Sequence, residues 1–370
     1  MKKLTLGFIG LGLIGGSIAK ALKASIPAIQ IIAYDVNKEA LNQATADGIV
    51  DTKVSEIDDN FSKCDYIFLC APVSKNEENL LTLKKYISPA CILTDVGSVK
   101  TGIHQAIDRL GLSEQFIGGH PMAGSERFGY LNSKAGLLEN AYYILTPADE
   151  VSAEKVESYK ELVLAIGAIP LVLDAARHDF ITAAISHLPH VISASLVNLV
   201  KASDSEDETM KMIAAGGFKD ITRISSSSPD MWQQICLTNT ENILTLLDRY
   251  ISSLEEIRKE ISGKEETALY DFFNDARLYR DSFIEASSGP IKKSYAITID
   301  IADKTGALAS IATLLASHQI SIKNIGIVHN RELAEGALRI EFYGEEDICT
   351  AGHILKSKGY LIHEKGERQL

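Results

Sequence analysis

The chain has 370 residues, 46% of them hydrophobic, which is more than one hydrophobic core usually serves, so we expect two or three domains. Its 37 Lys and Arg stand against 49 Asp and Glu, and the resulting formal charge of −12, without any basic run, argues against nucleic acid as a partner. The five cysteines are scattered without a C-x-x-C pair, and no run of about 18 uninterrupted apolar residues occurs. We therefore expect a reduced, cytoplasmic chain with no disulfide framework, zinc site or membrane partner.

The first predicted strand, residues 4–9, leads directly into a glycine-rich turn and a helical pattern from Ser17. Gly10 permits a tight turn, Gly12 allows a pyrophosphate to approach the backbone, and Gly15 lets the helix pack on the strand. The alternative is that these glycines serve packing alone. The predicted dinucleotide contacts are Gly10, Gly12, Leu13, Ile14 and Gly15.

The second predicted strand, residues 30–34, ends at Asp35. A carboxylate at this place can accept hydrogen bonds from the adenosine ribose hydroxyls and would repel a 2′-phosphate. We therefore expect NAD as the cofactor in preference to NADP, although Lys38 nearby could weaken that preference.

Further strands alternate with helical stretches up to residue 174, which indicates an α/β domain with a doubly wound, mainly parallel sheet at residues 1–174. These strands are predicted at residues 66–70, 91–94, 116–117, 142–145 and 171–173. Ligands of such sheets bind beyond the carboxyl ends of the strands. The segments that leave strands there should line one crevice with the nicotinamide, and they are residues 71–73 with Ala71 and Pro72, residues 95–100, and residues 118–125.

His120 lies between glycines in the last of these segments, and Ser98 lies in the one before it. A dehydrogenase that oxidises an alcohol needs a group that accepts the hydroxyl proton, and neutral imidazole suits this role. The alternatives are a solvated loop histidine and a serine that caps the helix predicted from Lys100. Because a dinucleotide loop precedes it, we interpret His120 as catalytic, and the loop position of Ser98 allows it to form a hydrogen bond with a substrate hydroxyl.

Helical periodicity replaces the strands from residue 175 and predicts an all-helical domain at residues 175–288. Its first helix, residues 176–200, contains Pro189, which removes one backbone donor and predicts a kink near Ile185. Ser186 and His190 are four residues apart on one helix face. No carboxylate or cysteine accompanies them at ligand spacing, so we interpret them as a polar patch facing the crevice and expect no metal.

A second block of the helical domain runs from Gly216-Gly217 to Asp220 and Arg223. Asp220 and Arg223 could form a surface ion pair, but an arginine beside a double glycine could also hold a substrate carboxylate through two hydrogen bonds. Two long helical patterns follow at residues 231–261 and 264–286, and their length predicts packing against a second subunit, hence a homodimer.

Residues 286–290 have the composition of a linker, and a compositionally separate module follows at residues 293–370. Residues 291–370 contain ten Lys and Arg against ten Asp and Glu, so the negative charge lies elsewhere in the chain. The predicted order of elements is βαββαβ, typical of a ferredoxin-like domain. The predicted elements are strand 294–301, helix 307–317, strands 321–328 and 336–343, helix 347–358 and strand 361–363. Without a histidine or cysteine cluster, the module is interpreted as regulatory.

Together these motifs resemble the prephenate dehydrogenase family with a C-terminal ACT domain. The similar segments are Gly97 to Lys100, His120 to Gly124, Ser186 to His190, Gly216 to Arg223 and Asp303 to Leu308. The resemblance implies oxidation and decarboxylation of prephenate to 4-hydroxyphenylpyruvate with NAD, with His120 and Ser98 at the ring hydroxyl. It also implies substrate binding at the far end of prephenate by Ser186, His190, Gly216, Asp220 and Arg223. Feedback control by an aromatic amino acid, tyrosine, is implied at Asp303, Gly306, Ala307 and Asn324.

Three other functions stay open at this point. Arogenate carries an amino group where prephenate has a keto group, and a dehydrogenase for it would give tyrosine directly. The β-hydroxyacid dehydrogenases share a similar opening at residues 7–12 but use a catalytic lysine in their helical domain. A non-catalytic amino-acid sensor would use only the C-terminal module.

Overall fold

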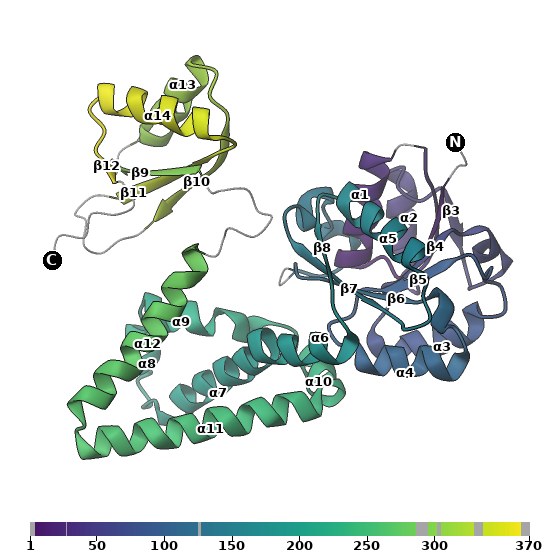
Figure 1. Ribbon diagram of the computed structural model, residues 1–370, viewed down its shortest axis with the longest axis horizontal. Coiled ribbons are helices and arrows are strands. Elements are labelled where there is room, and N and C mark those ends of the chain that lie inside the picture. The colour runs from purple at the N-terminus through teal and green to yellow at the C-terminus, as the bar shows by residue number, and fades with distance from the viewer. Residues whose placement is uncertain are drawn as a thin grey trace. The chain divides into compact units, whose positions relative to one another are not determined.

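The structure is a computed structural model that describes residues 4–26, 28–124, 127–285, 295–301, 305–328 and 336–363. It divides into two compact units, Met1–Lys259 and Glu260–Leu370 (Figure 1). The boundaries predicted at residues 174, 288 and 293 stay predictions, and the linker predicted at residues 286–290 lies outside the described residues.

The first unit begins with a parallel sheet of five strands in the order β3-β2-β1-β4-β5. The strands are β1 (Thr5–Ile9), β2 (Gln30–Tyr34), β3 (Thr52–Val54), β4 (Tyr66–Leu69) and β5 (Ile92–Asp95). The helices between them are α1 (Leu13–Ser25), α2 (Lys38–Ala46), α3 (Val73–Leu83) and α4 (Thr101–Leu110). Alternate residues of β4 enter two hydrophobic clusters, Phe68 in one and Ile67 in the other, so both faces of the sheet are covered.

A smaller sheet of order β6-β7-β8 continues the unit. Its strands are β6 (Ile117–Pro121), β7 (Tyr142–Pro147) and β8 (Ile169–Val172), with α5 (Ala153–Ala165) before β8. An isolated parallel bridge joins Leu93 to Phe116, whereas β6 and β7 are antiparallel. The predicted parallel, α/β arrangement is confirmed for the first five strands, and the β6–β7 pair is the exception to it.

The strand predicted at residues 116–117 is longer than expected, because β6 includes Gly118, Gly119 and His120. The loop predicted at residues 118–125 is therefore wrong for residues 118–121, which belong to β6. Ser125 lies outside the described residues. Pairing with β7, in which His120 stands opposite Ile144, holds these residues extended.

The helical part of the first unit begins with one long, interrupted helix (Figure 1). The elements are α6 (Ala175–Thr182), a π-helical turn (Ala183–His187), α7 (Leu188–Ser203), α8 (Thr209–Ile213), α9 (Gly216–Thr222), a 3₁₀ turn (Arg223–Ser226), α10 (Pro229–Thr238) and α11 (Thr240–Gly263). A kink was predicted near Ile185, and a π-helical turn lies there, since Pro189 cannot donate the hydrogen bond that an α-helix requires. The single helix predicted at residues 231–261 is wrong, because Asn239, with φ −120° and ψ 33°, separates α10 from α11.

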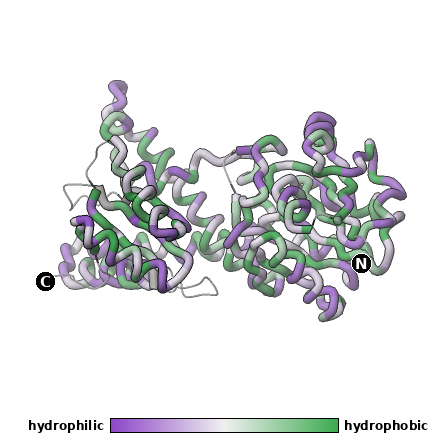
Figure 2. The backbone as a smooth tube through the Cα atoms, turned by 90° about the horizontal axis from the view of Figure 1, so that it is seen from above, coloured by the Kyte–Doolittle hydropathy of each residue, from purple (hydrophilic) through white to green (hydrophobic). Residues whose placement is uncertain are grey.

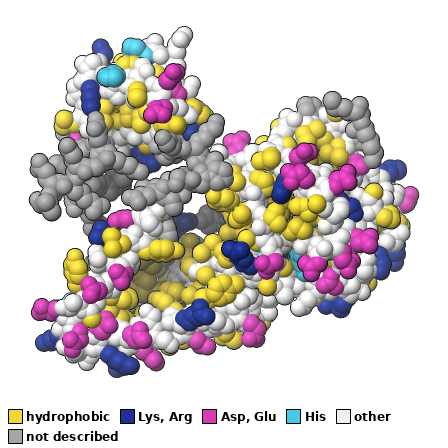
Figure 3. Space-filling view, viewed as in Figure 1, with side chains coloured by type: hydrophobic (Ala, Val, Ile, Leu, Met, Phe, Trp, Pro, Cys, Tyr) yellow, Lys and Arg dark blue, Asp and Glu magenta, His cyan; other side chains and the backbone are white. Residues whose placement is uncertain are grey.

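Hydrophobic side chains gather over these helices on the face shown in Figure 3. Leu199 of α7 is 62% exposed and Leu237 of α10 is 72% exposed. Among the described residues, one helical stretch, Ala175–Ser203, is long and apolar enough to cross a membrane by length and composition alone. It nevertheless carries the buried polar pair His178 and Asp179, which contacts the start of α4.

The second unit begins at Glu260, near the end of α11, and contains α12 (Glu266–Glu285) and an antiparallel sheet of order β10-β11-β9-β12. Its elements are β9 (Tyr295–Ile301), α13 (Ala307–Ser317), β10 (Ile322–Val328), β11 (Gly336–Phe342), α14 (Glu345–Ser357) and β12 (Ile362–His363). Hydrophobic residues follow the strands of this sheet in Figure 2, and Ile299, Leu338 and Ile340 are fully buried in its core. The βαββαβ order predicted for this region is therefore present.

Candidate active site

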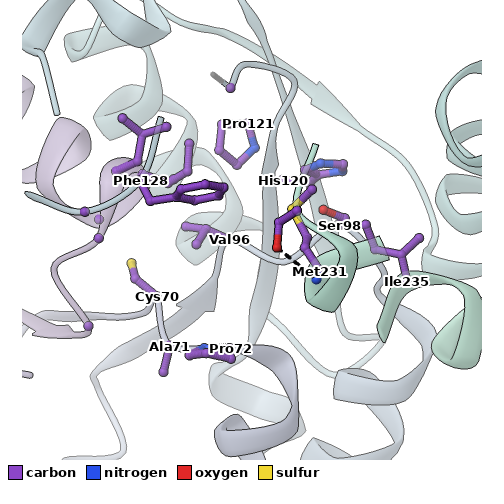
Figure 4. Close-up of a pocket in the computed structure, with 18 of the residues that line it drawn as sticks. Cys70, Ala71, Pro72, Val96, Ser98, His120, Pro121, Phe128, Met231 and Ile235 are labelled. Carbon is purple, nitrogen blue, oxygen red and sulfur yellow. Dashed lines mark hydrogen bonds between the residues drawn. The ribbon is translucent and has the colours of Figure 1, made fainter. Parts of the chain in front are cut away.

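A cavity of about 1060 Å³ lies in the first unit between the glycine-rich turn, the ends of the strands and the helical part. Figure 4 shows Ser98 and His120 near Met231 and Ile235 of α10, with Ala71 and Pro72 at another side of the cavity. Most of the predicted site residues line this cavity. They are Gly10, Gly12, Leu13, Ile14, Gly15, Asp35, Ala71, Pro72, Ser98, His120, Ser186 and His190.

The glycine-rich turn has the form that a dinucleotide requires. Gly10 has a φ of +99°, and a Cβ there would lie 2.8 Å from the backbone of Ala71. A Cβ on Gly15 would lie 2.6 Å from the carbonyl oxygen of Gly10, whereas one on Gly12 would meet nothing within 4 Å. Gly12 therefore leaves open space at the N-terminus of α1, where no side chain caps the free backbone amides.

Asp35 lies at the end of β2 and faces the same cavity. One carboxylate oxygen accepts a hydrogen bond from the backbone amide of Leu11 at 2.6 Å, and the other accepts from that of Asn37 at 2.7 Å. The carboxylate is thus fixed against the glycine-rich turn, and its remaining lone pairs can accept from a ribose hydroxyl.

His120 is connected to a buried pair that the sequence reasoning missed. Its Nδ1 lies 2.8 Å from Nε2 of His178, and Nδ1 of His178 lies 2.8 Å from Oδ1 of Asp179. His178 is fully buried and Asp179 is 1% exposed, whereas His120 lines the cavity. The chain therefore contains an uninterrupted row of hydrogen-bonding groups behind His120.

A second buried network lies beneath β6. Nζ of Lys100 donates to Asp95 at 2.5 Å and to the carbonyl oxygen of Gly119 at 2.7 Å, and Oδ1 of Asp95 accepts from the backbone amide of Gly119 at 3.2 Å. Burial lowers the pKa of Lys100, and the neighbouring Asp95 opposes this effect. The ion pair ties the end of β5 to the peptide that precedes His120.

Ser98 is not the cap of the helix that follows it, contrary to one of the two predicted roles. The N-cap position of α4 is Lys100, and its own side chain makes no capping hydrogen bond. The carboxylate of Asp179 accepts instead from the backbone amides of Lys100 at 2.7 Å and Thr101 at 2.8 Å. Ser98 itself lines the cavity.

The electrostatic surroundings keep His120 neutral. Burial, the positive charge of Lys100 and the neighbouring rings of His178 and His187 together hold the pKa of His120 well below its ordinary value of 6.5. A neutral imidazole can accept a proton, so His120 has the charge state that the predicted role demands.

Another side of the cavity is formed by the π-helical turn, the start of α7 and α10. His190 stacks on Trp232 with ring centroids 3.7 Å apart and donates from Nδ1 to the carbonyl oxygen of Ser186 at 2.8 Å. Burial lowers the pKa of His190, the hydrogen bond to Ser186 raises it, and the charge of Arg223 lowers it further. Burial also lowers the pKa of His187 to about 4.

Three predicted substrate residues do not reach the wall in this structure. Gly216 and Asp220 are exposed on α9, and Arg223 is exposed at the start of the 3₁₀ turn, although its charge acts on His190. No group of three or more His, Cys, Asp or Glu is arranged to hold a metal ion within the part of the chain that is described.

The wall also contains residues that no motif singled out. Phe128 lines the cavity, and α10 contributes Met231, Trp232 and Ile235. Only the amphipathic pattern of α10 signals that one of its faces is covered, and nothing in it indicates by what.

Two family models match the chain over most of its length. "Prephenate dehydrogenase, nucleotide-binding domain" matches residues 18–171, and "Prephenate dehydrogenase, dimerization domain" matches residues 174–275. A prephenate dehydrogenase of Bacillus subtilis (strain 168) is 37% identical over 96% of this chain and 96% of its own.

Solved structures agree with these matches. Prephenate dehydrogenase of A. aeolicus, in complex with hydroxyphenyl propionate and NAD+, is 30% identical with a TM-score of 0.72, covering 76% of this chain and 99% of that one. Synechocystis arogenate dehydrogenase is 29% identical with a TM-score of 0.68, covering 76% of this chain and 100% of that one.

Proposed function

The chain belongs to the prephenate dehydrogenase family, and we propose that it oxidises and decarboxylates prephenate to 4-hydroxyphenylpyruvate with NAD in tyrosine biosynthesis. One observation carries the proposal: a single cavity contains a dinucleotide-type turn and a neutral histidine. A dehydrogenase site requires both, since a bound cofactor must meet a group that accepts the hydroxyl proton.

NAD would be held by the glycine-rich turn, by Asp35 and by the segment that contains Ala71 and Pro72. The open space at Gly12 and the uncapped N-terminus of α1 suit its pyrophosphate. When bound, NAD supplies the acceptor for the hydride that leaves the substrate. The protein contributes the position of the cofactor and the exclusion of a 2′-phosphate by the carboxylate of Asp35.

His120 accepts the proton of the ring hydroxyl as the carbonyl develops. Because the hydroxyl becomes more acidic during oxidation, its hydrogen bond to a neutral imidazole strengthens towards the transition state. Ser98 holds the same hydroxyl or orients the ring of His120. Loss of the ring carboxylate then restores aromaticity, so the protein mainly supplies orientation and electrostatic stabilisation.

The far end of the substrate carries a carboxylate, for which Ser186, His190 and Arg223 are the candidates. Arg223 acts electrostatically on His190, which places its positive charge close to that wall. Gly216 and Asp220 belong to the same segment and would position Arg223. A guanidinium prefers to bind a carboxylate through two parallel hydrogen bonds.

Arogenate is the second candidate substrate, because the Synechocystis protein with the same fold is named arogenate dehydrogenase. The two substrates differ only in a keto or amino group at the end remote from His120. The residues near His190 therefore decide between them.

We also propose that the protein is a soluble homodimer and that tyrosine regulates it through an ACT-type C-terminal domain. The exposed hydrophobic side chains of α7 and α10, with the match to a dimerization domain, support the dimer. The βαββαβ order supports the ACT assignment. Gly306, with φ +86°, precedes α13, which begins at Ala307, and Asn324 is exposed on β10, whereas Asp303 lies outside the described residues.

Replacement of His120 by Asn tests the proposal directly. We expect turnover, measured as NADH formation from prephenate, to fall roughly 100-fold or more with little change in the Michaelis constant, since acid–base groups commonly contribute factors of this size. The matched control is His104→Asn, because His104 bonds to Thr146 at 3.0 Å and does not line the cavity. Near-normal turnover of His120→Asn would remove His120 from the mechanism. Parallel assays with arogenate decide the substrate.

A further inference from the structure

We propose that Asp179 is a positioning residue for both catalytic candidates: through His178 it fixes the tautomer of His120, and through the start of α4 it fixes the segment that holds Ser98. The proposal rests on the function proposed above, which gives His120 and Ser98 their roles. It gives a positioning role to the buried pair His178 and Asp179, which does not line the cavity.

The two oxygens of Asp179 serve two different elements. Oδ1 lies 2.8 Å from Nδ1 of His178 and also accepts from the backbone amide of Lys100 at 2.7 Å. Oδ2 accepts from the backbone amide of Thr101 at 2.8 Å. With 1% exposure, the carboxylate makes these bonds without competition from water.

The order of hydrogen bonds determines where the protons lie. An ionised carboxylate only accepts, so Nδ1 of His178 carries the proton in their bond. In a neutral ring Nε2 of His178 then has a lone pair, and it accepts from Nδ1–H of His120. His120 is left with its lone pair on Nε2, which is the form able to accept a proton from a substrate.

The ionised state of Asp179 is supported by its surroundings. Burial alone would raise the pKa of its carboxyl, but the hydrogen bonds from His178, Thr101 and Lys100 outweigh burial and lower it. The ammonium of Lys100 and the ring of His187 are the other chargeable groups that act on His120. Burial keeps His187 neutral, and Lys100 is paired with Asp95.

The second role of Asp179 follows from the missing cap of α4. The first backbone amides of a helix have no partner within it, and a carboxylate there is stabilised by the helix dipole. Asp179 occupies this position although it belongs to α6, in the helical part of the unit. Ser98 precedes Lys100 by two residues, so the anchored amides of Lys100 and Thr101 limit the movement of Ser98.

Asn239 of the α10–α11 junction also contacts Asp179, through the backbone of that residue. Its Nδ2 donates to the backbone carbonyl oxygen of Asp179 at 2.8 Å and lies 3.1 Å from Nδ1 of His187. Asn239 is the residue at which α10 ends, so the break between α10 and α11 brings its side-chain amide against α6. Asp179 is therefore held by contacts with the start of α4 and with the end of α10.

Replacement of Asp179 by Asn separates positioning from mere packing. The amide is nearly isosteric, but it has one oxygen where the carboxylate accepts from three N–H groups, so its NH₂ must face either Thr101 or the pair His178 and Lys100. In the first case the start of α4 loses an acceptor, and in the second the hydrogen bonds of His178 reverse and leave a proton on Nε2 of His120. We expect turnover to fall at least 100-fold, with Michaelis constants within about threefold, as when an equivalent aspartate-to-asparagine change imposes the wrong histidine tautomer. His178→Gln keeps an oxygen that can accept from His120, so it should retain at least about tenfold more turnover than Asp179→Asn.

The matched control is Asp174→Asn, because Asp174 is exposed and caps the same helix, α6, through the amide of Arg177 at 2.7 Å. This variant should keep wild-type turnover. Turnover of Asp179→Asn within threefold of wild type overturns the proposal. Equal losses in Asp179→Asn and His178→Gln also overturn it, since they would reveal a purely structural role.

Nitrogen-15 NMR of histidine-labelled protein reads the tautomer without any substrate. The His120 resonances, identified by their absence in His120→Asn, should show Nδ1 protonated and Nε2 unprotonated in the wild type. A protonated Nε2 in the neutral wild-type ring overturns the proposal even if the variant does not fold. Failure of the wild type to oxidise prephenate or arogenate would instead refute the proposed function and leave this spectrum as a separate result.

Discussion

Three neighbours act on the imidazole of His120 in the same direction. Burial of the ring is the largest effect that lowers the pKa of His120, and Lys100, His178 and His187 lower it further. The buried ion pair of Lys100 with Asp95 thus has an electrostatic role besides holding β6, since its ammonium lies near a base that must stay neutral.

A pH profile tests this arrangement. Lowering the pKa of a base keeps it neutral at lower pH, so the acidic limb of kcat/KM that belongs to His120 should lie below its ordinary pKa of 6.5. We expect kcat/KM for prephenate to stay constant as the pH falls from neutrality to about 6.5 and to decline only below it. The measurement is steady-state NADH formation at saturating NAD. An acidic limb with its midpoint at or above 6.5 would contradict the assigned surroundings of His120.

At the level of residues, the sequence predicts those that motifs mark and misses those that only the fold brings together. Gly12 and His120 stand out because their local pattern demands a turn or a reactive group. Asp179 is 59 residues away from His120 in the chain, and a single sequence contains no signal that joins them. Ser98 was given two possible roles, and the cap supplied from α6 excludes one of them.

At the level of elements, the close packing of β6 explains why two glycines precede His120. A Cβ on Gly118 would lie 2.3 Å from Oγ1 of Thr146, and one on Gly119 would lie 2.6 Å from the carbonyl oxygen of Asp95. β6 can therefore pack this closely against β7 and the end of β5 only without side chains at these two positions. From the sequence, two adjacent glycines indicate a flexible loop. In the structure they are needed because no space is left for a side chain at either position.

Replacement of Gly119 by Ala should destabilise the first unit. The added methyl group would force backbone to move, and overpacking of this kind commonly costs about 1–3 kcal/mol. Gly102→Ala is the matched control, because a Cβ there meets nothing within 4 Å and α4 already holds this residue in a helix. Chemical denaturation of both variants measures the difference. An equal free energy of unfolding for Gly119→Ala and wild type would show that β6 is not tightly held.

At the same scale, hydrophobic periodicity predicts which segments form helices and strands. It does not predict where each element ends, because tertiary contacts set those ends. Pro189 predicts a disturbance of the helix near Ile185, where the π-helical turn lies, because proline acts locally. The break at Asn239 was not, since its cause is a hydrogen bond to α6 across 60 residues of sequence. Elements whose limits are set by distant partners cannot be read from a local pattern.

At the scale of the whole molecule, the site and the proposed regulatory domain belong to different units. Every residue that lines the cavity lies between Ile9 and Ile235, within the first unit. The A. aeolicus enzyme is matched over 99% of its chain by 76% of this one, so about a quarter of this chain has no counterpart in that relative. Catalysis should therefore not require the C-terminal sheet.

Truncation after Pro290 separates catalysis from regulation. The shortened chain keeps α12 and every cavity residue, so we expect turnover with prephenate to stay within about threefold of the full chain while inhibition by tyrosine disappears, because the effector would bind to the part removed. Initial rates with and without tyrosine, at subsaturating prephenate, measure both effects. Tyrosine resembles the product, so any weak inhibition that remains and is competitive with prephenate would indicate binding in the cavity itself. Undiminished tyrosine sensitivity of the truncated chain would place the regulatory site within residues 1–290 and refute the proposed role of the ACT-type domain.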